Sequence, residues 1–319
     1  MKYLMFSRPG DPAPRLGAVA QGGDVIDVKA AAAPKWSGEC PATLVDLIRA
    51  GADAWRRLSD LLRGAEVTHA AKQIRWHAPI PRPAKNIVCL GLNYASHVQE
   101  TSKPGRQPKL PEVPIFFTKA PTTVNGPYDR IPWDRAATAE VDYEVELGVI
   151  LGANARNLTR AVSRGHVFGY TIVNDVSARD LQFRHGQWFK GKSLDGFCPM
   201  GPVVVTADEF GDPQTKRLSL RVNCATRQDA TTADMIFPID VILEHLSRGM
   251  TLEAGDIIAT GTPDGVGLGR TPPEYLRDGD VIEAEIEGIG TLRNQLVATA
   301  PAPDRATSAD TRLKPPSRS

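Results

Sequence analysis

The chain has 319 residues and a net charge of +1, and 41% of its residues are hydrophobic and 24% charged. This length suits one large domain or two, and the composition is ordinary for a globular protein with an ample core. The balanced charge excludes the basic surface expected of a protein that binds nucleic acid or an anionic membrane.

Two further features bear on location. The four cysteines are far apart and form no Cys-x-x-Cys pair, so they are expected to be reduced thiols. Residues 1–6 are followed too soon by Pro9 to form the apolar region of a secretory signal, and no apolar run approaches the roughly 18 residues of a membrane span. We therefore predict a cytoplasmic protein.

Residues 1–78 are predicted to form a small α+β domain. Two short apolar segments flank the Gln-Gly-Gly turn at 21–23, which indicates a β-hairpin. Two helical patterns at 42–50 and 54–63 each end at a glycine, a common residue just after a helix.

A stiff, proline-rich linker at 79–83 opens a larger predicted domain, 79–298. Gly-rich turns and scarce long helices favour a mainly β fold with some α (α+β), an antiparallel barrel or sandwich rather than a wound βαβ sheet. One helix is predicted at 239–249, and the tail 299–319 is predicted to be disordered. Strands are predicted at 86–90, 115–119, 141–150, 168–173, 203–206, 218–223, 256–260, 281–286 and 292–296.

Acidic residues stand out in the strand predicted at 141–150. Its alternation places Glu144 and Glu146 on one face, about 7 Å apart at Cα from two rises of ~3.3 Å. These carboxylates would repel each other and raise each other's pKa unless a cation lay between them. Asp175 follows the next apolar strand, and three oxygen ligands would suit a hard ion such as Mg²⁺. The alternatives are a solvated acidic strand face and, for Asp175, a helix cap.

Two pairs of polar residues have helical spacing. Arg179 and Gln182 share a face at i,i+3, where an arginine can bind a substrate carboxylate and a glutamine offers both a donor and an acceptor. His97 and Glu100 have the same spacing and could orient a water molecule and take its proton. The alternatives are surface residues for the first pair and a structural histidine for the second. The polar loop 101–108 is either a lid or a surface excursion.

The segment 186–193 matches the Gly-x-x-x-x-Gly-Lys-Ser pattern of phosphate-binding loops. Trp188 and Phe189 occupy its interior, and Pro199 blocks the helix that should follow, so we interpret the match as coincidental. Lys192 is still a candidate cation beside an anionic substrate or enolate, or else a surface lysine. The turn at 261–267 either presents Thr262 to a substrate oxygen or is purely structural.

Taken together, these segments closely resemble the fumarylacetoacetate hydrolase family over residues 85–298. The matching pieces are Gly-Leu-Asn-Tyr-Ala-Ser-His at 91–97, Phe-Thr-Lys at 117–119, Asp-Tyr-Glu-Val-Glu-Leu at 142–147, Asn-Asp-Val-Ser-Ala-Arg-Asp at 174–180, Gly-Lys-Ser-Leu-Asp at 191–195 and Thr-Gly-Thr-Pro at 260–263.

The resemblance implies a β-roll catalytic domain, usually in a homodimer, that acts on a small oxo acid with Mg²⁺ or a similar ion such as Mn²⁺ or Ca²⁺. It also implies roles for ten residues: metal ligation by Glu144, Glu146 and Asp175, catalysis by His97, Glu100 and Lys192, and substrate contacts by Lys119, Arg179, Gln182 and Thr262. The N-terminal segment looks like that of the longer bacterial members.

The motifs leave the reaction open, because relatives hydrolyse, decarboxylate, isomerise or hydrate related oxo acids. Our leading hypothesis is hydrolysis of a carbon–carbon bond in a β-diketo acid such as an acylpyruvate or fumarylpyruvate, by water activated at His97 and Glu100. The alternative is decarboxylation, isomerisation or hydration of an oxo-dicarboxylate, oxaloacetate or a 2-hydroxymuconate-like acid. A protein that only binds its ligand is the alternative from another class.

Overall fold

The structure, a computed structural model, describes residues 1–102 and 109–299. The lid proposed at 101–108 and the disordered tail predicted at 299–319 therefore lie almost wholly outside the described residues. Within the described residues, none of the helices has the length and apolar character needed to cross a membrane.

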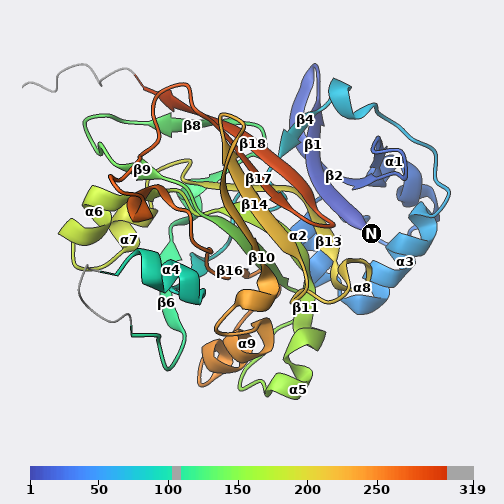
Figure 1. The fold of residues 1–319 in the computed structure, drawn as a ribbon. Helices are drawn as coiled ribbons and strands as arrows, with labels where there is room; N and C mark the ends of the chain where they lie inside the picture. Colours follow the sequence, from blue (N-terminus) through green and yellow to red (C-terminus); the bar gives the residue numbers. More distant parts are fainter. Residues whose placement is uncertain (103–108, 300–319) are drawn as a thin grey trace, which may run out of the picture.

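Two β-sheets form the centre of the molecule (Figure 1). The larger has 11 strands, and nine of them run in the order β3 (Val25–Asp27), β2 (Asp11–Val19), β1 (Lys2–Arg8), β13 (Cys198–Thr206), β11 (Val167–Asn174), β10 (Val145–Leu151), β16 (Ile257–Ala259), β5 (Ile87–Gly91) and β6 (Ile115–Lys119). Beside this path, β4 (Arg75–His77) pairs with β1 and β7 (Val124–Asn125) pairs with β13.

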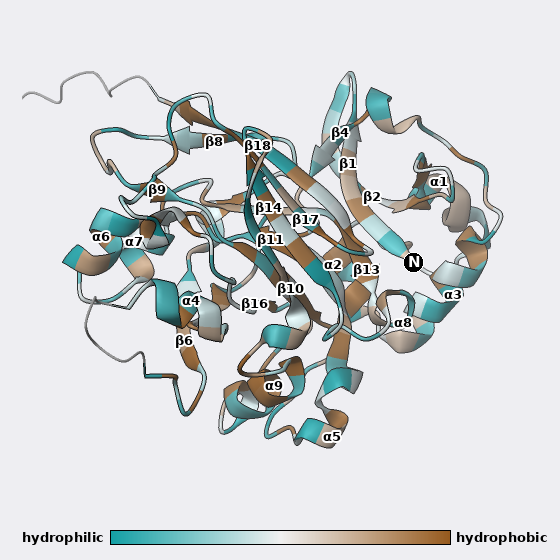
Figure 2. Cartoon of the chain, viewed as in Figure 1, coloured by the Kyte–Doolittle hydropathy of each residue, from teal (hydrophilic) through white to brown (hydrophobic). Residues whose placement is uncertain are grey.

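The second sheet has five strands, in the order β15 (Ala225–Thr231), β14 (Arg217–Val222), β17 (Val281–Ile286), β18 (Gly290–Ala298) and β8 (Arg130–Trp133). A two-stranded ribbon joins β9 (Val141–Asp142) to β12 (Ser177–Ala178). Strands β10, β11 and β13 of the large sheet contact β14, β17 and β18, and their buried side chains form one continuous core. Hydrophobic residues accordingly run along these central strands (Figure 2).

Short helices surround the sheets. Three of them, α1 (Val28–Ala32), α2 (Leu44–Arg49) and α3 (Ala52–Leu62), belong to the N-terminal segment, and α5 (Arg160–Ser163), α8 (Ala207–Phe210) and α9 (Ile239–Ser247) follow later strands. The remaining three are α4 (Ala95–Glu100), α6 (Arg179–Arg184) and α7 (Phe189–Lys192). Single 3₁₀ turns occur at Ala33–Lys35, Ala71–Gln73, Pro121–Thr123, Arg164–His166, Thr232–Asp234 and Gly267–Gly269.

The predicted mainly β, α+β class is confirmed, and the sheets do not close into a barrel within the described residues. The N-terminal strands are not a separate sheet: β1 pairs with β13 through Lys2 opposite Val205 and Tyr3 opposite Val204. A second core cluster also joins N-terminal side chains such as Tyr3 to Phe168 and Cys89. The division of the chain at residue 78 stays a prediction.

Six strands in the described part of the chain escaped the sequence analysis, namely β1, β4, β7, β8, β12 and β15. The sequence of β15, Ala-Thr-Arg-Gln-Asp-Ala-Thr, is polar and shows no clear alternation, since β15 is the edge of the smaller sheet and most of its side chains are not buried. The strand predicted at 141–150 is also broken, with residues 143–144 separating β9 from β10. That break lies in the candidate site.

Candidate functional site

Glu144 and Asp175 meet where β10 and β11 begin to separate. Val145 pairs with Asn174 at the end of the ladder. Beyond it, the backbone N–H of Glu144 donates to Asn174 Oδ1 at 3.0 Å, and the carbonyl of Glu144 accepts from the N–H of Asp175 at 2.9 Å. These bonds replace regular strand pairing and place the two carboxylates together.

Glu144, Glu146 and Asp175 form a buried acidic cluster. Each offers a carboxylate oxygen, and these oxygens all lie within 4.8 Å of one another. The three residues are at most 4% exposed, so the alternative of a solvated strand face is wrong. The helix-cap alternative for Asp175 is also wrong, because α6 begins later, with Ala178 as the N-cap residue and no side-chain cap.

Basic side chains pair two of these three carboxylates. Lys192 Nζ lies 2.7 Å from both Glu144 Oε2 and Asp175 Oδ2, and Arg179 Nη2 lies 2.7 Å from Glu144 Oε1. Burial alone would raise the pKa of Glu144, but Lys192 and Arg179 outweigh it and hold this pKa below its usual range. For Glu146, burial and the charges of Asp175 and Glu144 act in the same direction and raise the pKa well above its usual range.

The hydrogen bonding of the Glu146 carboxylate indicates whether the acidic cluster suits a metal ion. Its Oε2 accepts from the backbone N–H of Gly261 at 2.8 Å, but its Oε1 is buried without a hydrogen-bond partner. A buried carboxylate oxygen without a partner is costly, and Glu146 offers one oxygen to the cluster that it forms with Glu144 and Asp175. An all-oxygen set of this kind fits a hard divalent cation such as Mg²⁺.

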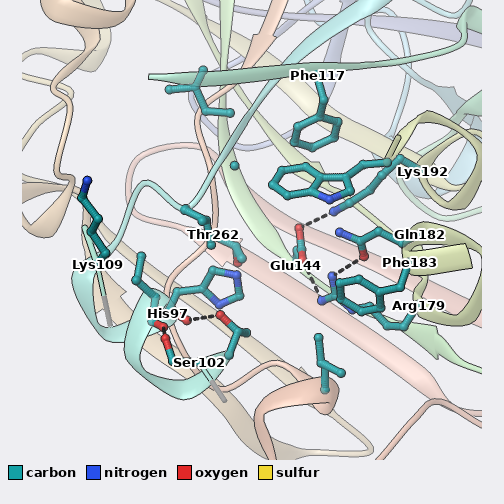
Figure 3. A pocket seen from close by; sticks show the side chains of 17 residues that line it. His97, Ser102, Lys109, Phe117, Glu144, Arg179, Gln182, Phe183, Lys192 and Thr262 are labelled. Carbon is teal, nitrogen blue, oxygen red and sulfur yellow. Dashed lines mark hydrogen bonds and ion pairs between the residues drawn. The ribbon is translucent and has the colours of Figure 1, made fainter. Parts of the chain in front are cut away.

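A cavity of about 280 Å³ opens beside this cluster. Of the three carboxylates only Glu144 lines it. Figure 3 shows Arg179, Gln182 and Lys192 on one side, from α6 and α7, and His97 on the other, from α4. Thr262, which follows β16, also lines the cavity, as do Phe117, Phe183 and Trp188. The fold thus brings together most of the residues singled out in the sequence.

Glu100, Glu146 and Asp175 do not line the cavity, and neither does Lys119. Its ammonium is fully buried, 2.5 Å from Asp175 Oδ1 and 3.0 Å from the carbonyl of Val176. In this position Lys119 forms a buried ion pair with Asp175, and its contact with a substrate stays a prediction.

Arg179 forms hydrogen bonds and ion pairs with neighbouring protein groups. Its Nε donates to Asp142 Oδ2 at 2.8 Å and its Nη1 to Gln182 Oε1 at 3.0 Å. Asp142, which the sequence analysis gave no role, also accepts from the backbone N–H groups of Gly267 and Leu268, at 2.7 and 3.0 Å. Asp142 thereby connects α6, through Arg179, to the 3₁₀ turn at Gly267–Gly269.

His97 and Glu100 lie on α4 and are hydrogen-bonded. His97 Nδ1 is 2.8 Å from Glu100 Oε1, and Glu100 Oε2 accepts from the N–H of Gly265 at 2.9 Å. Because an ionised carboxylate only accepts, Nδ1 carries the imidazole proton and Nε2 of a neutral His97 has a free lone pair. His97 is only 7% exposed and lines the cavity.

Gly265 supports this pair through its backbone. Its φ is +99°, and a Cβ added there would lie 1.9 Å from the carbonyl oxygen of Arg227. Only glycine fits such a position without displacing a backbone. The N–H that holds Glu100 therefore depends on a residue with no side chain.

Two further buried residues support the site and were missed in the sequence. Asn93 donates to the carbonyl of Thr260 at 2.8 Å and accepts from the N–H of Phe237 at 2.8 Å. Gln228, on β15, bonds to Val145 and Thr262. Asn93 stands inside a segment that resembles the family, which is a signal for it, but Gln228 belongs to a strand that the pattern did not predict.

The rejection of a phosphate-binding loop at 186–193 is confirmed. Helix α6 precedes this segment instead of a strand, and α7 has four residues. Gly191 serves packing, since a Cβ added there would lie 2.4 Å from the backbone nitrogen of Gln182.

Comparison with known proteins identifies the class. The family described as fumarylacetoacetate (FAA) hydrolase C-terminal matches residues 86–297. The chain therefore belongs to the fumarylacetoacetate hydrolase family, which confirms the resemblance, and it is an enzyme of that family.

Two relatives and one solved structure are similar to most of the chain. Oxaloacetate tautomerase YisK of Bacillus subtilis is 50% identical over 228 residues, which cover 72% of this chain and 75% of that protein. The mitochondrial oxaloacetate tautomerase FAHD2A of Bos taurus is 37% identical over 300 residues, 93% of this chain and 92% of the relative. Among solved structures, fumarylacetoacetate hydrolase (EaFAH) from Exiguobacterium antarcticum aligns with a TM-score of 0.76 and 42% identity, over 94% of this chain and 100% of that one.

These relatives contradict the leading hypothesis from the sequence. Hydrolysis of a carbon–carbon bond in a β-diketo acid was wrong, because the curated relatives are oxaloacetate tautomerases, and the oxo-dicarboxylate alternative is favoured. The error has a chemical reason. Hydrolysis and isomerisation can use the same polarised keto acid, and they differ in whether water is delivered, which no motif in the chain specifies.

Proposed function

We propose that this enzyme catalyses keto–enol tautomerisation of oxaloacetate or a closely related 2-oxo dicarboxylate, with a divalent cation, Mg²⁺ or Mn²⁺, held by Glu144, Glu146 and Asp175. The observation that carries this proposal is the hydrogen bond between His97 and Glu100, because His97 lines the same cavity as Glu144 of the acidic cluster. The names of the relatives point to the same reaction.

A cation held by the three carboxylates would supply Lewis-acid stabilisation of negative charge on the keto oxygen. The protein's own contribution is the proton transfer. His97 Nε2 takes a proton from the carbon next to the keto group, and the resulting imidazolium returns one to the enolate oxygen. Glu100 stabilises the imidazolium and fixes which nitrogen reacts.

Lys192 acts as a fixed positive charge rather than as a base. Burial would lower the pKa of Lys192, but the charges of Asp175 and Glu144 outweigh burial and raise it. An ammonium held in a water-poor cavity stabilises an enolate more strongly than it would in water.

Substrate recognition is proposed for Gln182, with Arg179 holding it in place. Gln182 Oε1 accepts from Arg179 Nη1, which leaves the Nε2 donor for a substrate carboxylate. A cavity of about 280 Å³ suits a small acid of this kind. The homodimer expected from the family stays a prediction, for which light scattering is the direct measurement.

The test follows the enol form of oxaloacetate by its ultraviolet absorbance in protein that has been stripped of metal and reloaded with Mg²⁺, with pyruvate measured in parallel. Loss of the enol should be faster with the loaded enzyme, without matching pyruvate, and much slower with His97→Asn. His185→Asn, at an exposed position after α6, is the matched control. Pyruvate as the main product, or no acceleration by loaded enzyme, would refute the proposal.

A further inference from the structure

Gln228 is a buried amide whose orientation is fixed by three hydrogen bonds. It is 1% exposed. Its Oε1 accepts from the backbone N–H of Val145 at 3.0 Å, and its Nε2 donates to the carbonyl of Pro263 at 2.9 Å and to Thr262 Oγ1 at 2.7 Å. An N–H cannot accept and a carbonyl cannot donate, so only this orientation of the amide satisfies all three bonds.

The same reasoning fixes the hydroxyl of Thr262. Its Oγ1 lies 2.9 Å from the carbonyl oxygen of Val145, to which it must be the donor. A hydroxyl has one proton and two lone pairs. The proton is directed to Val145 and one lone pair accepts from Gln228, so a single lone pair remains.

Turning the hydroxyl proton toward a ligand would be unfavourable. It would leave the oxygens of Thr262 and Val145 facing each other at 2.9 Å with no proton between them. The bond donated by Gln228 also polarises the hydroxyl and strengthens its donation to Val145.

We propose that Gln228 and the Val145 carbonyl set the direction of hydrogen bonding at Thr262, so that this residue recognises a donor on the ligand, the hydroxyl of the enol form. This inference rests on the proposed tautomerase function. The keto form of an ionised 2-oxo dicarboxylate carries only acceptors, whereas the enol form adds one O–H. Thr262 lines the cavity, where its remaining lone pair can accept a hydrogen bond from the O–H of the enol. It should therefore bind the enol form more tightly than the keto form. Gln228 is a positioning residue, since it acts through Thr262.

The first experiment compares the two directions of the reaction. KM for the enol and for the keto form of oxaloacetate is measured with Mg²⁺-loaded wild type, Thr262→Val and Thr262→Ser. Thr262→Val should raise KM for the enol by about threefold to tenfold, the scale of one hydrogen bond, and leave KM for the keto form unchanged. Thr262→Ser restores the hydroxyl and should return the ratio of the two KM values toward that of wild type. A purely structural defect would shift both KM values alike.

A binding experiment separates this inference from the proposed function. Malate carries a donor hydroxyl, and 2-fluorosuccinate replaces it with fluorine, which only accepts. Calorimetry on Mg²⁺-loaded protein should show that Thr262→Val weakens the binding of malate by about threefold to tenfold. The affinity for 2-fluorosuccinate should not change. This comparison needs no turnover, so it stands even if the enzyme proves not to be a tautomerase.

Gln228→Met tests the positioning role. It should reduce the preference for malate over 2-fluorosuccinate in wild type but have no further effect on that preference in Thr262→Val, because the two residues act through one hydroxyl. The proposal is overturned if Thr262→Val weakens both ligands equally or neither, or if the effects of Gln228→Met and Thr262→Val on the preference are additive.

Discussion

The two sides of the cavity satisfy their polar groups in different ways. On the side of β10 and α7, full charges meet, with Lys192 bridging Glu144 and Asp175 at 2.7 Å. On the side of α4 and the turn after β16, His97 and Thr262 are held by a single carboxylate, an amide and backbone groups. The charged side should therefore control metal binding and the electrostatics of the site, and the other side should control proton transfer. Substitutions can separate these two properties.

The largest effect is expected for Glu146→Ala, on the charged side. Activity should fall to background, because the variant lacks a proposed metal ligand, the only buried carboxylate oxygen among the described residues that has no hydrogen-bond partner. The stabilisation by Mg²⁺, about 2.7 kcal/mol when the ion is at a hundredfold its dissociation constant, should also vanish. Scanning calorimetry with Mg²⁺ and with EDTA measures it, and Glu285→Ala, exposed on β17, is the control. If Mg²⁺ still stabilised the Glu146→Ala variant, ligation of the ion by Glu146 would be contradicted.

Lys192→Met should lower kcat by a factor on the order of 10² to 10³, the scale for removing one group that stabilises developing negative charge. Mg²⁺ affinity should not fall, because the variant loses a cation that competes for Glu144 and Asp175. Titration with Mg²⁺ and enol-decay kinetics give the two quantities. Lys190→Met, exposed on the same helix, should leave both unchanged. A drop in Mg²⁺ affinity with unchanged kcat would reverse the assignment of Lys192.

On the opposite side, Glu100→Gln should lower kcat by a factor on the order of 10², because His97 loses the carboxylate that stabilises its protonated form. Shape and the capacity to accept from Gly265 are kept. Mg²⁺ affinity should barely change, since Glu100 is not a proposed ligand. If Mg²⁺ binding collapsed with the rate, the separation of the two sides would be wrong.

The smallest effect is a pH dependence of stability in the metal-free protein. The raised pKa of Glu146 means that the folded state binds this proton more readily than the unfolded state, so stability should decrease as pH rises from 4.5 through the raised pKa. The lowered pKa of Glu144 acts in the opposite direction and below 4.5, so the two windows do not overlap. Denaturant unfolding in EDTA measures the slope above pH 4.5. Glu146→Gln should flatten it, and an unchanged slope would show that another group is responsible.

Much of the fold was predictable because regular elements carry their own spacing. The alternation at 281–286 and the apolar stripe in 239–249 reappear as β17 and α9, with a shift of two residues at the end of the helix. The sequence analysis missed β15 because this edge strand is polar and shows no alternation of polar and apolar residues. The broken strand before Val145 was missed because hydrogen bonds from outside the strand, to Asn174 and Asp175, interrupt the pairing at that point.

By itself, the sequence determined the family, the α+β class and the acidic residues that could share a cation, because these depend on local spacing and on residue types that stand in the chain. Only the tertiary structure decided which groups those residues contact. Lys119 holds Asp175 from a position 56 residues away, and Gln228 reaches Thr262 across 34 residues. No local pattern encodes contacts of that range, because they arise where β6, β10, β11 and β15 and the turn after β16 converge. The direction of the hydrogen bonds at Thr262 is therefore a property of the packed sheets.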